Sequence, residues 1–130
     1  MSSDIGIHKV INLPCTKKEF YRLWLTFLTP LHHLTPKVIE IAAELLRHRQ
    51  ELSKVILDEV MLTKVLLSQE TRDEIIKDCD ITLSNFHVAI GKLKKAHFFK
   101  DGVINPRLIP QIPDDSKDYN LALAFHVKDE

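Results

Sequence analysis

Hydrophobic residues recur every three or four positions over much of this 130-residue chain, which is the spacing of amphipathic α-helices. The first such stretch follows Thr16 and Glu19, a pair that forms a capping box, and predicts a helix from about residue 17 to 29. Large apolar side chains form a stripe along this helix: Phe20, Leu23, Trp24, Phe27 and Leu28. Aromatic stripes usually belong to a core. If the helix lies outside the core of the remaining chain, we expect the stripe to be a docking face.

Pro30 is expected to end this helix, and residues 31–34 to form a link. Thr35 and Pro36 then predict a new helix, because proline is well suited to the first helical position. Its apolar residues continue to about Arg49. From residue 51 to 67 the pattern stays helical, and it leaves open whether this is one bent helix or two with a break near Asp58.

Two short helices joined by a tight turn are predicted next. Thr71 and Glu74 form a second capping-box pattern, so a helix should begin there and end near Asp80, a residue type that tolerates left-handed backbone angles. Thr82 offers an N-cap to the following helix. The helix turns Phe86, Ile90 and Leu93 inward and the following residues outward: Ser84, Asn85, His87, Val88, Gly91, Lys92, Lys94 and Lys95.

Short strands are predicted after these helices. Asp101-Gly102 is a strong turn signal between residues 96–100 and 103–104, which should form a hairpin. Residues 119–127 alternate large apolar side chains with small or polar ones, the pattern of a half-buried strand. We expect this strand to pair with the hairpin or with an N-terminal arm around residues 5–11, giving a three-stranded sheet.

The segment from Glu74 to Leu93, followed by the hairpin and Ile104-Asn105-Pro106, resembles the winged helix-turn-helix of MarR-like regulators and of plasmid and phage replication initiators. The resemblance covers about a third of the chain. It implies a mainly α protein with a small β-sheet: a winged helix-turn-helix domain over residues 35–130 that ends in a C-terminal strand. Residues 1–34 add an N-terminal arm and amphipathic helix, and we expect all of these to form one compact domain.

The resemblance also implies a site on double-stranded DNA. Residues 83–95 would be the recognition helix in the major groove, where asparagine can bond an adenine edge and valine can contact a thymine methyl group. The residues expected at or near the groove are Thr82, Ser84, Asn85, His87 and Val88, and those expected at phosphates are Lys92, Lys94, Lys95, Lys100 and Arg107. Such a protein would be a phage- or plasmid-type regulator or replication-associated factor.

Charge allows this function without requiring it. Eighteen basic and eighteen acidic residues cancel over the whole chain, but residues 82–107 contain five basic residues and one acidic residue. Residues 108–130 contain two basic and five acidic residues. DNA-binding relatives often carry a long polar residue near the positions of Leu83 and Val88, and both are apolar here.

These apolar positions support an alternative function. The protein would be a non-enzymatic structural or adaptor protein, such as a phage particle or assembly component, that uses the same fold to contact other proteins. Its partner-binding residues would be Leu83, Val88, Trp24, Phe20 and Phe27. The pattern leaves open whether the chain forms a homodimer or a larger assembly.

The sequence offers no basis for an enzyme, a cofactor or a small-molecule substrate. It contains no glycine-rich phosphate loop, nucleophile elbow or informative carboxylate pair. His32 and His33 are adjacent, so their side chains point apart and do not suggest a metal site. Cys15 and Cys79 are too isolated for a metal motif and are expected to be free thiols.

No signal peptide and no apolar run of about 20 residues is present in the sequence. We therefore expect no membrane association and a cytoplasmic protein, which means the host cytoplasm for a phage-encoded regulator and the virion for a particle component.

Overall fold

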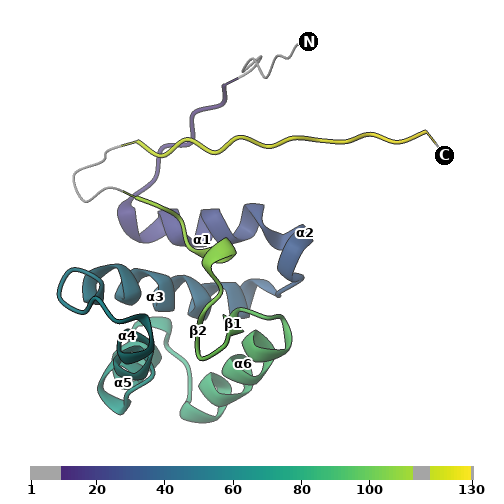
Figure 1. Cartoon of the computed structure of the whole chain (residues 1–130). Helices are drawn as coiled ribbons and strands as arrows, with labels where there is room; N and C mark the ends of the chain where they lie inside the picture. Colours follow the sequence, from purple (N-terminus) through teal and green to yellow (C-terminus); the bar gives the residue numbers. More distant parts are fainter. Residues whose placement is uncertain (1–9, 113–117, 130) are drawn as a thin grey trace. The chain divides into compact units, whose positions relative to one another are not determined.

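The computed structural model describes residues 10–112 and 118–129 of the chain. The described part is mainly helical and contains one small antiparallel sheet (Figure 1). It divides into two units: residues 15–110, called the helical unit below, and residues 1–14 with 111–130. The helical unit contains α1 (Lys17–Phe27), α2 (Thr29–His32), α3 (Pro36–Leu52), α4 (Glu59–Leu66), α5 (Gln69–Cys79), α6 (Leu83–Lys95), β1 (Phe99–Lys100), β2 (Val103–Ile104) and the 3-10 helix η1 (Pro106–Leu108).

This division differs from the expected boundary between residues 34 and 35. Helix α1 belongs to the helical unit because it packs along α3. The N-terminal helix is therefore part of the same core as the helices that follow it.

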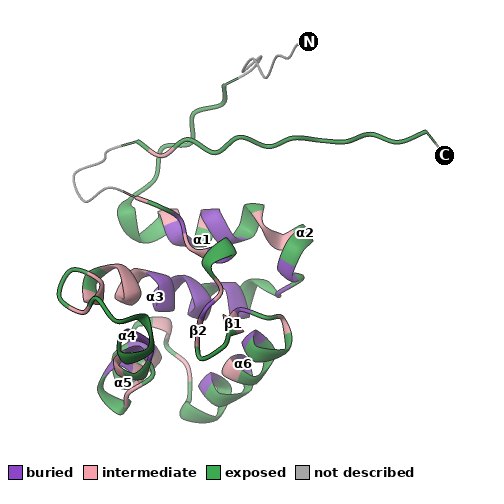
Figure 2. Ribbon diagram, viewed as in Figure 1, coloured by how far each residue is buried: buried purple, intermediate pink, exposed green. Residues whose placement is uncertain are grey.

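Helix α3 is the centre of that core. It contacts α1, α4, α5 and α6, and in Figure 1 it lies between α1 on one side and the other three on the other. Residues 41–46 are all buried, so this part of the helix is covered on every side (Figure 2). A helix buried all round holds its neighbours in place mainly through the hydrophobic effect.

Helix α1 begins as predicted but turns a different set of residues inward. Thr16 and Glu19 form the capping box, with Glu19 N donating to Thr16 Oγ1 at 3.1 Å and Thr16 N to Glu19 Oε1 at 2.9 Å. The buried residues are Tyr21, Trp24 and Leu25, whereas Phe27 is exposed. The residues facing the core thus include two that the predicted stripe did not contain.

Trp24 joins α1 to the far end of the helical unit. Its indole Nε1 donates a buried hydrogen bond of 2.9 Å to the carbonyl oxygen of Leu108 in η1, just beyond the hairpin. The indole is therefore a core group, as expected for most aromatic stripes, and Trp24 is not available to the docking face of the alternative function.

The chain around Pro30 does not form the loop expected there. Pro30 lies in the first turn of α2, where its missing N–H costs nothing. His32 in α2 is buried: Leu34 N donates to its Nδ1 at 2.9 Å, and its Nε2 lies 2.7 Å from Leu25 O. Because Nδ1 accepts, Nε2 carries the proton and donates, so this histidine links α1 to the short segment before α3.

The stretch after α3 forms a loop and a separate helix. Helix α3 extends to Leu52, beyond the expected end near Arg49, and α4 begins after Asp58. The Asp58 side chain accepts from Val60 N at 3.0 Å as an N-cap. Of the two alternatives that the sequence left open, the structure thus has two helices with a break near Asp58.

Helix α5 starts earlier than predicted, after Ser68 as N-cap. Thr71 therefore lies inside the helix and does not cap it. Its hydroxyl donates to Val65 O in α4 at 3.2 Å, and the side chain is buried between the two helices. A tertiary contact replaced the local cap that the Thr-x-x-Glu pattern suggested.

The turn between α5 and α6 matches the prediction. Asp80 has φ 53° and ψ 53°, the left-handed conformation expected of it. Ile81 N donates back to Ile76 O at 3.1 Å, which closes the end of α5. Thr82 then caps α6, because its hydroxyl accepts from Asn85 N at 3.0 Å.

The predicted hairpin is present. Phe99 pairs with Ile104 and Lys100 with Val103, and Asp101 and Gly102 form the two-residue turn with φ of 55° and 81°. Two successive positive φ values are characteristic of a type I′ turn, which suits the twist of a hairpin.

The predicted C-terminal strand is absent: residues 118–129 contain no strand, and the sheet in the described part has only β1 and β2. Each strand is two residues long, and Pro106 soon after β2 lacks an N–H for pairing. The hairpin is therefore too short to hold a long third strand. Of the expected arm, residues 5–9 lie outside the described residues.

Replacing Trp24 with Phe should destabilise the protein by about 2 kcal/mol, because Leu108 O would be left buried without its donor. Urea unfolding followed by circular dichroism measures this change. As a control on the same helix, Phe27→Ser should cost within about 0.5 kcal/mol because Phe27 is exposed. An equal cost for both variants would show that the Trp24 contact contributes little.

Candidate nucleic-acid interface

Helix α6 presents one face to the core and leaves the other uncovered. Phe86, Ala89 and Leu93 are buried against the helical unit, whereas Ile90 is only half-buried. The exposed face carries Leu83, Ser84, Asn85, His87, Val88, Gly91, Lys92, Lys94 and Lys95. All predicted site residues on α6 are thus exposed on one helix, and the capping residue Thr82 is exposed at its start.

The hairpin and η1 each add one more of the predicted cations. Lys100 lies in β1 and Arg107 in η1, and both are exposed. Asn105 caps η1: its side-chain oxygen accepts from the backbone N of Arg107 at 3.1 Å, and its Nδ2 donates to His97 O at 3.1 Å. This asparagine thus links η1 to the segment that follows α6, a role that the sequence pattern did not predict.

The five cations of this region are uncompensated. Within the part of the chain that the structure describes, none of Lys92, Lys94, Lys95, Lys100 and Arg107 forms an ion pair. Several cations elsewhere are paired: Arg47 with Glu44 and Arg49 with Glu59. Exposed cations without internal partners remain available to an external anion.

His87 is held at the surface by its neighbour. Its ring meets the buried ring of Phe86 edge-on, with centroids 6.2 Å apart and planes at 68°. Packing of this kind restricts rotation of the imidazole ring while leaving it exposed. The side chain is therefore partly oriented before a partner binds.

Gly91 occupies the middle of the exposed face. A Cβ added there would meet no atom within 4 Å, so nothing in the described structure requires a glycine. Glycine inside a helix costs about 1 kcal/mol relative to alanine. The exposed face of α6 therefore has no side chain at its centre, and the helix is less stable than it would be with alanine there.

The residues of the alternative protein-contact site are not gathered in one place. Leu83 and Val88 lie on α6 and are exposed by 45% and 55%. On α1, Trp24 is buried, Phe20 is half-buried with its ring 5.3 Å from that of Tyr21, and only Phe27 is exposed. Any contact surface made from this set consists of two separate patches.

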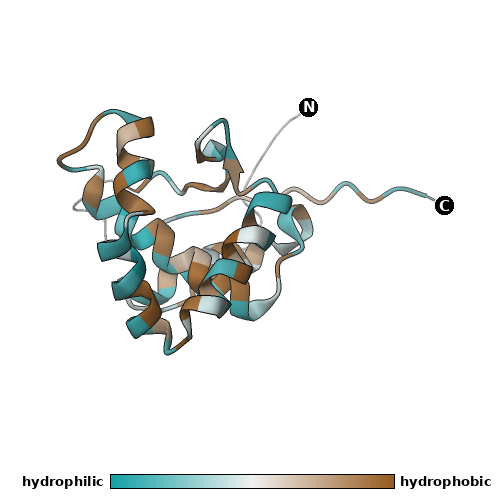
Figure 3. Ribbon diagram, turned by 90° about the horizontal axis from the view of Figure 1, so that it is seen from below, coloured by the Kyte–Doolittle hydropathy of each residue, from teal (hydrophilic) through white to brown (hydrophobic). Residues whose placement is uncertain are grey.

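Exposed apolar residues also surround the start of α4, where the sequence pattern did not indicate a surface. Val55 and Leu57 in the loop before α4 are exposed by 79% and 91%, and Val60 and Met61 in its first turn are also exposed. The loop is the hydrophobic segment at the far left of Figure 3. The pattern of residues 51–67, which includes Val55, Val60 and Met61, predicted helical structure and did not indicate that these residues are exposed.

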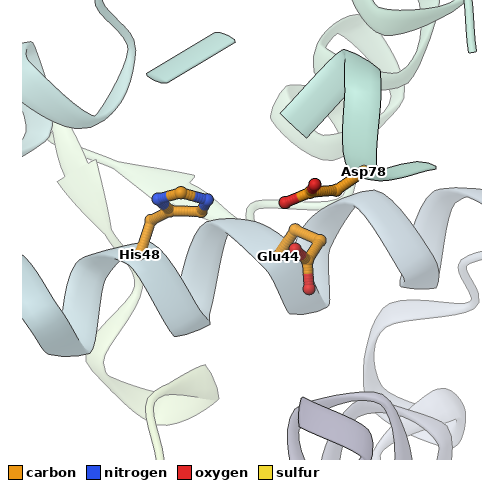
Figure 4. A group of neighbouring side chains, drawn as sticks. All are labelled: Glu44, His48 and Asp78. Atoms are coloured by element: carbon orange, nitrogen blue, oxygen red, sulfur yellow. The ribbon is translucent and has the colours of Figure 1, made fainter. Parts of the chain in front are cut away.

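Glu44, His48 and Asp78 lie close together between α3 and α5 (Figure 4). Their potential ligand atoms are within 4.8 Å of one another. However, Arg47 already engages the carboxylates: its Nη2 and Nε are 2.9 Å and 3.2 Å from the two Glu44 oxygens, and Nη2 is 3.5 Å from Asp78 Oδ2. We therefore interpret the group as an ion-pair network that joins α3 to α5.

The two cysteines are free, as predicted. Burial raises the pKa of the Cys79 thiol to about 12, and Glu40, Glu44 and Asp78 add to this shift. The thiol is protonated at neutral pH, and this makes Cys79 a poor nucleophile.

In the part of the chain that the structure describes, no helix combines the length and hydrophobicity needed to cross a membrane.

Arg47→Met should destabilise the fold by about 3 kcal/mol, because the Glu44 carboxylate, with a side chain only 6% exposed, would lose its counter-charge. Chemical denaturation measures the loss. The double variant Glu44→Gln with Arg47→Met should recover much of it, since no buried charge remains. A single variant as stable as the parent would contradict this role for Arg47.

Comparison of the chain with protein-family models, with curated proteins and with solved structures gives no match.

Proposed function

We propose that α3, α5, α6 and the hairpin form a winged helix-turn-helix and that the protein binds double-stranded DNA. The observation that carries the proposal is the uncovered face of α6, which ends in Lys92, Lys94 and Lys95 and is followed directly by a hairpin. Helix, turn, helix and hairpin in this order are the parts of a winged DNA-binding domain.

In this proposal α6 enters the major groove. Ser84, Asn85 and His87 supply polar groups for base edges, and Val88 can contact a thymine methyl group. Thr82 lies at the end of the helix that approaches the DNA first. Leu83 makes apolar contact beside the bases.

The cations position the helix on the duplex. Lys92, Lys94 and Lys95 reach phosphates on one side of the groove, while Lys100 and Arg107 reach the adjacent backbone from the hairpin and η1. Their lack of ion-pair partners in the described part of the chain supports this role. The resemblance to phage and plasmid proteins suggests a regulator or a replication-associated factor.

A second function is favoured by a different observation. The exposed apolar residues before and at the start of α4, together with Leu83 and Val88, are groups that protein interfaces commonly bury. An adaptor or particle component would use these surfaces to bind proteins, and α6 would then contact protein in place of DNA.

Binding to a labelled random duplex across a salt series tests the first function. Log affinity should fall steeply with log salt, and replacing Lys92, Lys94 and Lys95 with Ala should reduce that slope by about three. The matched control replaces Lys17, Lys37 and Lys64, exposed lysines on α1, α3 and α4, and should change the slope much less. An absence of binding at low salt would exclude the DNA function and leave the protein-contact function.

Gly91→Ala separates binding from folding. The added methyl group meets no protein atom, so the variant should be more stable by up to about 1 kcal/mol. The same methyl group would keep α6 from approaching the groove closely, and affinity for duplex should fall by about tenfold. Unchanged affinity in the glycine variant would show that the centre of this face does not meet the DNA.

A further inference from the structure

The start of α1 and the last turns of α3 enclose a pocket of about 260 Å³. Three side chains from each helix line it: Lys17, Lys18, Tyr21, Arg47, Gln50 and Glu51. All of them belong to the helical unit, in which α1 packs along α3 (Figure 1). A pocket of this volume holds several waters but is smaller than most sites for drug-sized molecules, so it suits a small ligand.

Tyr21 gives this pocket a polar group without a protein partner. The residue is only 1% exposed, yet its hydroxyl forms no hydrogen bond within residues 10–112 and 118–129. Side chains of a helix lean towards its N-terminus, so the Tyr21 ring covers the turn that contains Lys17 and Lys18. Burial raises the pKa of the hydroxyl, and the Glu51 carboxylate raises it further. The hydroxyl is therefore protonated at neutral pH and available as a donor to a ligand.

The charged groups that α3 contributes are already neutralised. Glu51 pairs with Lys54 at 2.7 Å. Arg47 uses Nε and Nη2 for the Glu44 carboxylate, and its Nη1 forms no hydrogen bond in the part of the chain that the structure describes. The guanidinium thus keeps N–H donors for a ligand while it remains bound to Glu44.

The uncompensated charge comes from the first turn of α1. Lys17 and Lys18 are exposed, and neither forms an ion pair among the described residues. Their backbone N–H groups also lack acceptors there, because the capping box satisfies Glu19 N and Thr16 N. Two lysines and the open N–H groups of a helix start together favour an anion with two negative charges.

We propose that this pocket binds the phosphate group of a small phosphate ester. A phosphate monoester carries a charge of about −1.5 to −2 at neutral pH and three strong acceptor oxygens. Its charge matches Lys17 and Lys18, and its oxygens match the donors of Tyr21 and Arg47. A carboxylate has one charge and two oxygens, so it would leave part of this set unused.

The pocket is separate from the surface proposed for DNA. It lies between α1 and α3, whereas α6 packs on the other side of α3. The inference therefore does not rest on DNA binding by α6. A phosphate of a DNA backbone is the other source of the same chemistry, and competition between a duplex and a small phosphate ester distinguishes the two.

Calorimetric titration of the full-length chain with inorganic phosphate, at neutral pH and constant ionic strength, tests the site. We expect binding in the millimolar range or tighter, and no binding up to about 50 mM phosphate would overturn the proposal. Tyr21→Phe should weaken binding at least about tenfold, because it removes one donor to a charged group. Its thermal unfolding without phosphate should match that of the parent, since the hydroxyl has no protein partner among the described residues. Unchanged affinity in this variant would exclude the hydroxyl as a ligand.

The lysines are tested with a matched pair of variants. Lys17→Ala with Lys18→Ala should weaken phosphate binding at least about tenfold, because the charge that balances the anion is lost. Lys37→Ala with Lys64→Ala removes two exposed lysines of α3 and α4 that do not line the pocket, and should leave the affinity unchanged. An equal loss in both double variants would show that only the net charge of the protein matters.

Two further titrations identify the source of the phosphate. Glycerol 3-phosphate should bind severalfold more tightly than inorganic phosphate, because the pocket has room beyond the phosphate group; no gain would restrict the site to the free ion and overturn the ester. Its affinity should be unchanged in the presence of a short duplex. Displacement by the duplex would assign the pocket to the DNA backbone instead.

Discussion

The burial of α3 is the constraint on which the helical unit depends. Its central residues are covered on all sides, so α1, α4, α5 and α6 each find their position by packing against the same helix. Ala42 and Ala43 keep this part of α3 narrow and let its neighbours approach closely. Glu44 is the one charged residue in the buried stretch 41–46. Arg47 offsets the cost of burying its carboxylate and also reaches Asp78 in α5.

The candidate site follows from this packing. Phe86 and Leu93 hold one side of α6 against the unit, and the opposite side is exposed among the described residues. Two hydrogen bonds fix the base of the hairpin: Asn105, just after β2, donates to the carbonyl of His97 before β1, and Trp24 of α1 donates to the carbonyl of Leu108 in η1. A core contact between distant parts of the sequence thus supports the surface on which we place DNA.

The chain has separate surfaces for separate contacts. The cations and polar groups of α6 suit a phosphate backbone, whereas the exposed apolar residues around the start of α4 suit a protein partner. Local exposure alone does not reveal a function; what distinguishes these surfaces is the match between pattern and partner chemistry.

The sequence by itself determined the features that local hydrogen bonds and backbone preferences control. The Thr16 and Thr82 caps, the left-handed Asp80 and the Asp101-Gly102 turn are where the pattern placed them, because each depends on residues a few positions apart. Tertiary structure decided the rest, because packing between helices competes with the local pattern. It drew Thr71 into a contact with α4, buried Trp24 and His32, and turned Val55 and Leu57 outward, and residues 118–129 form no strand.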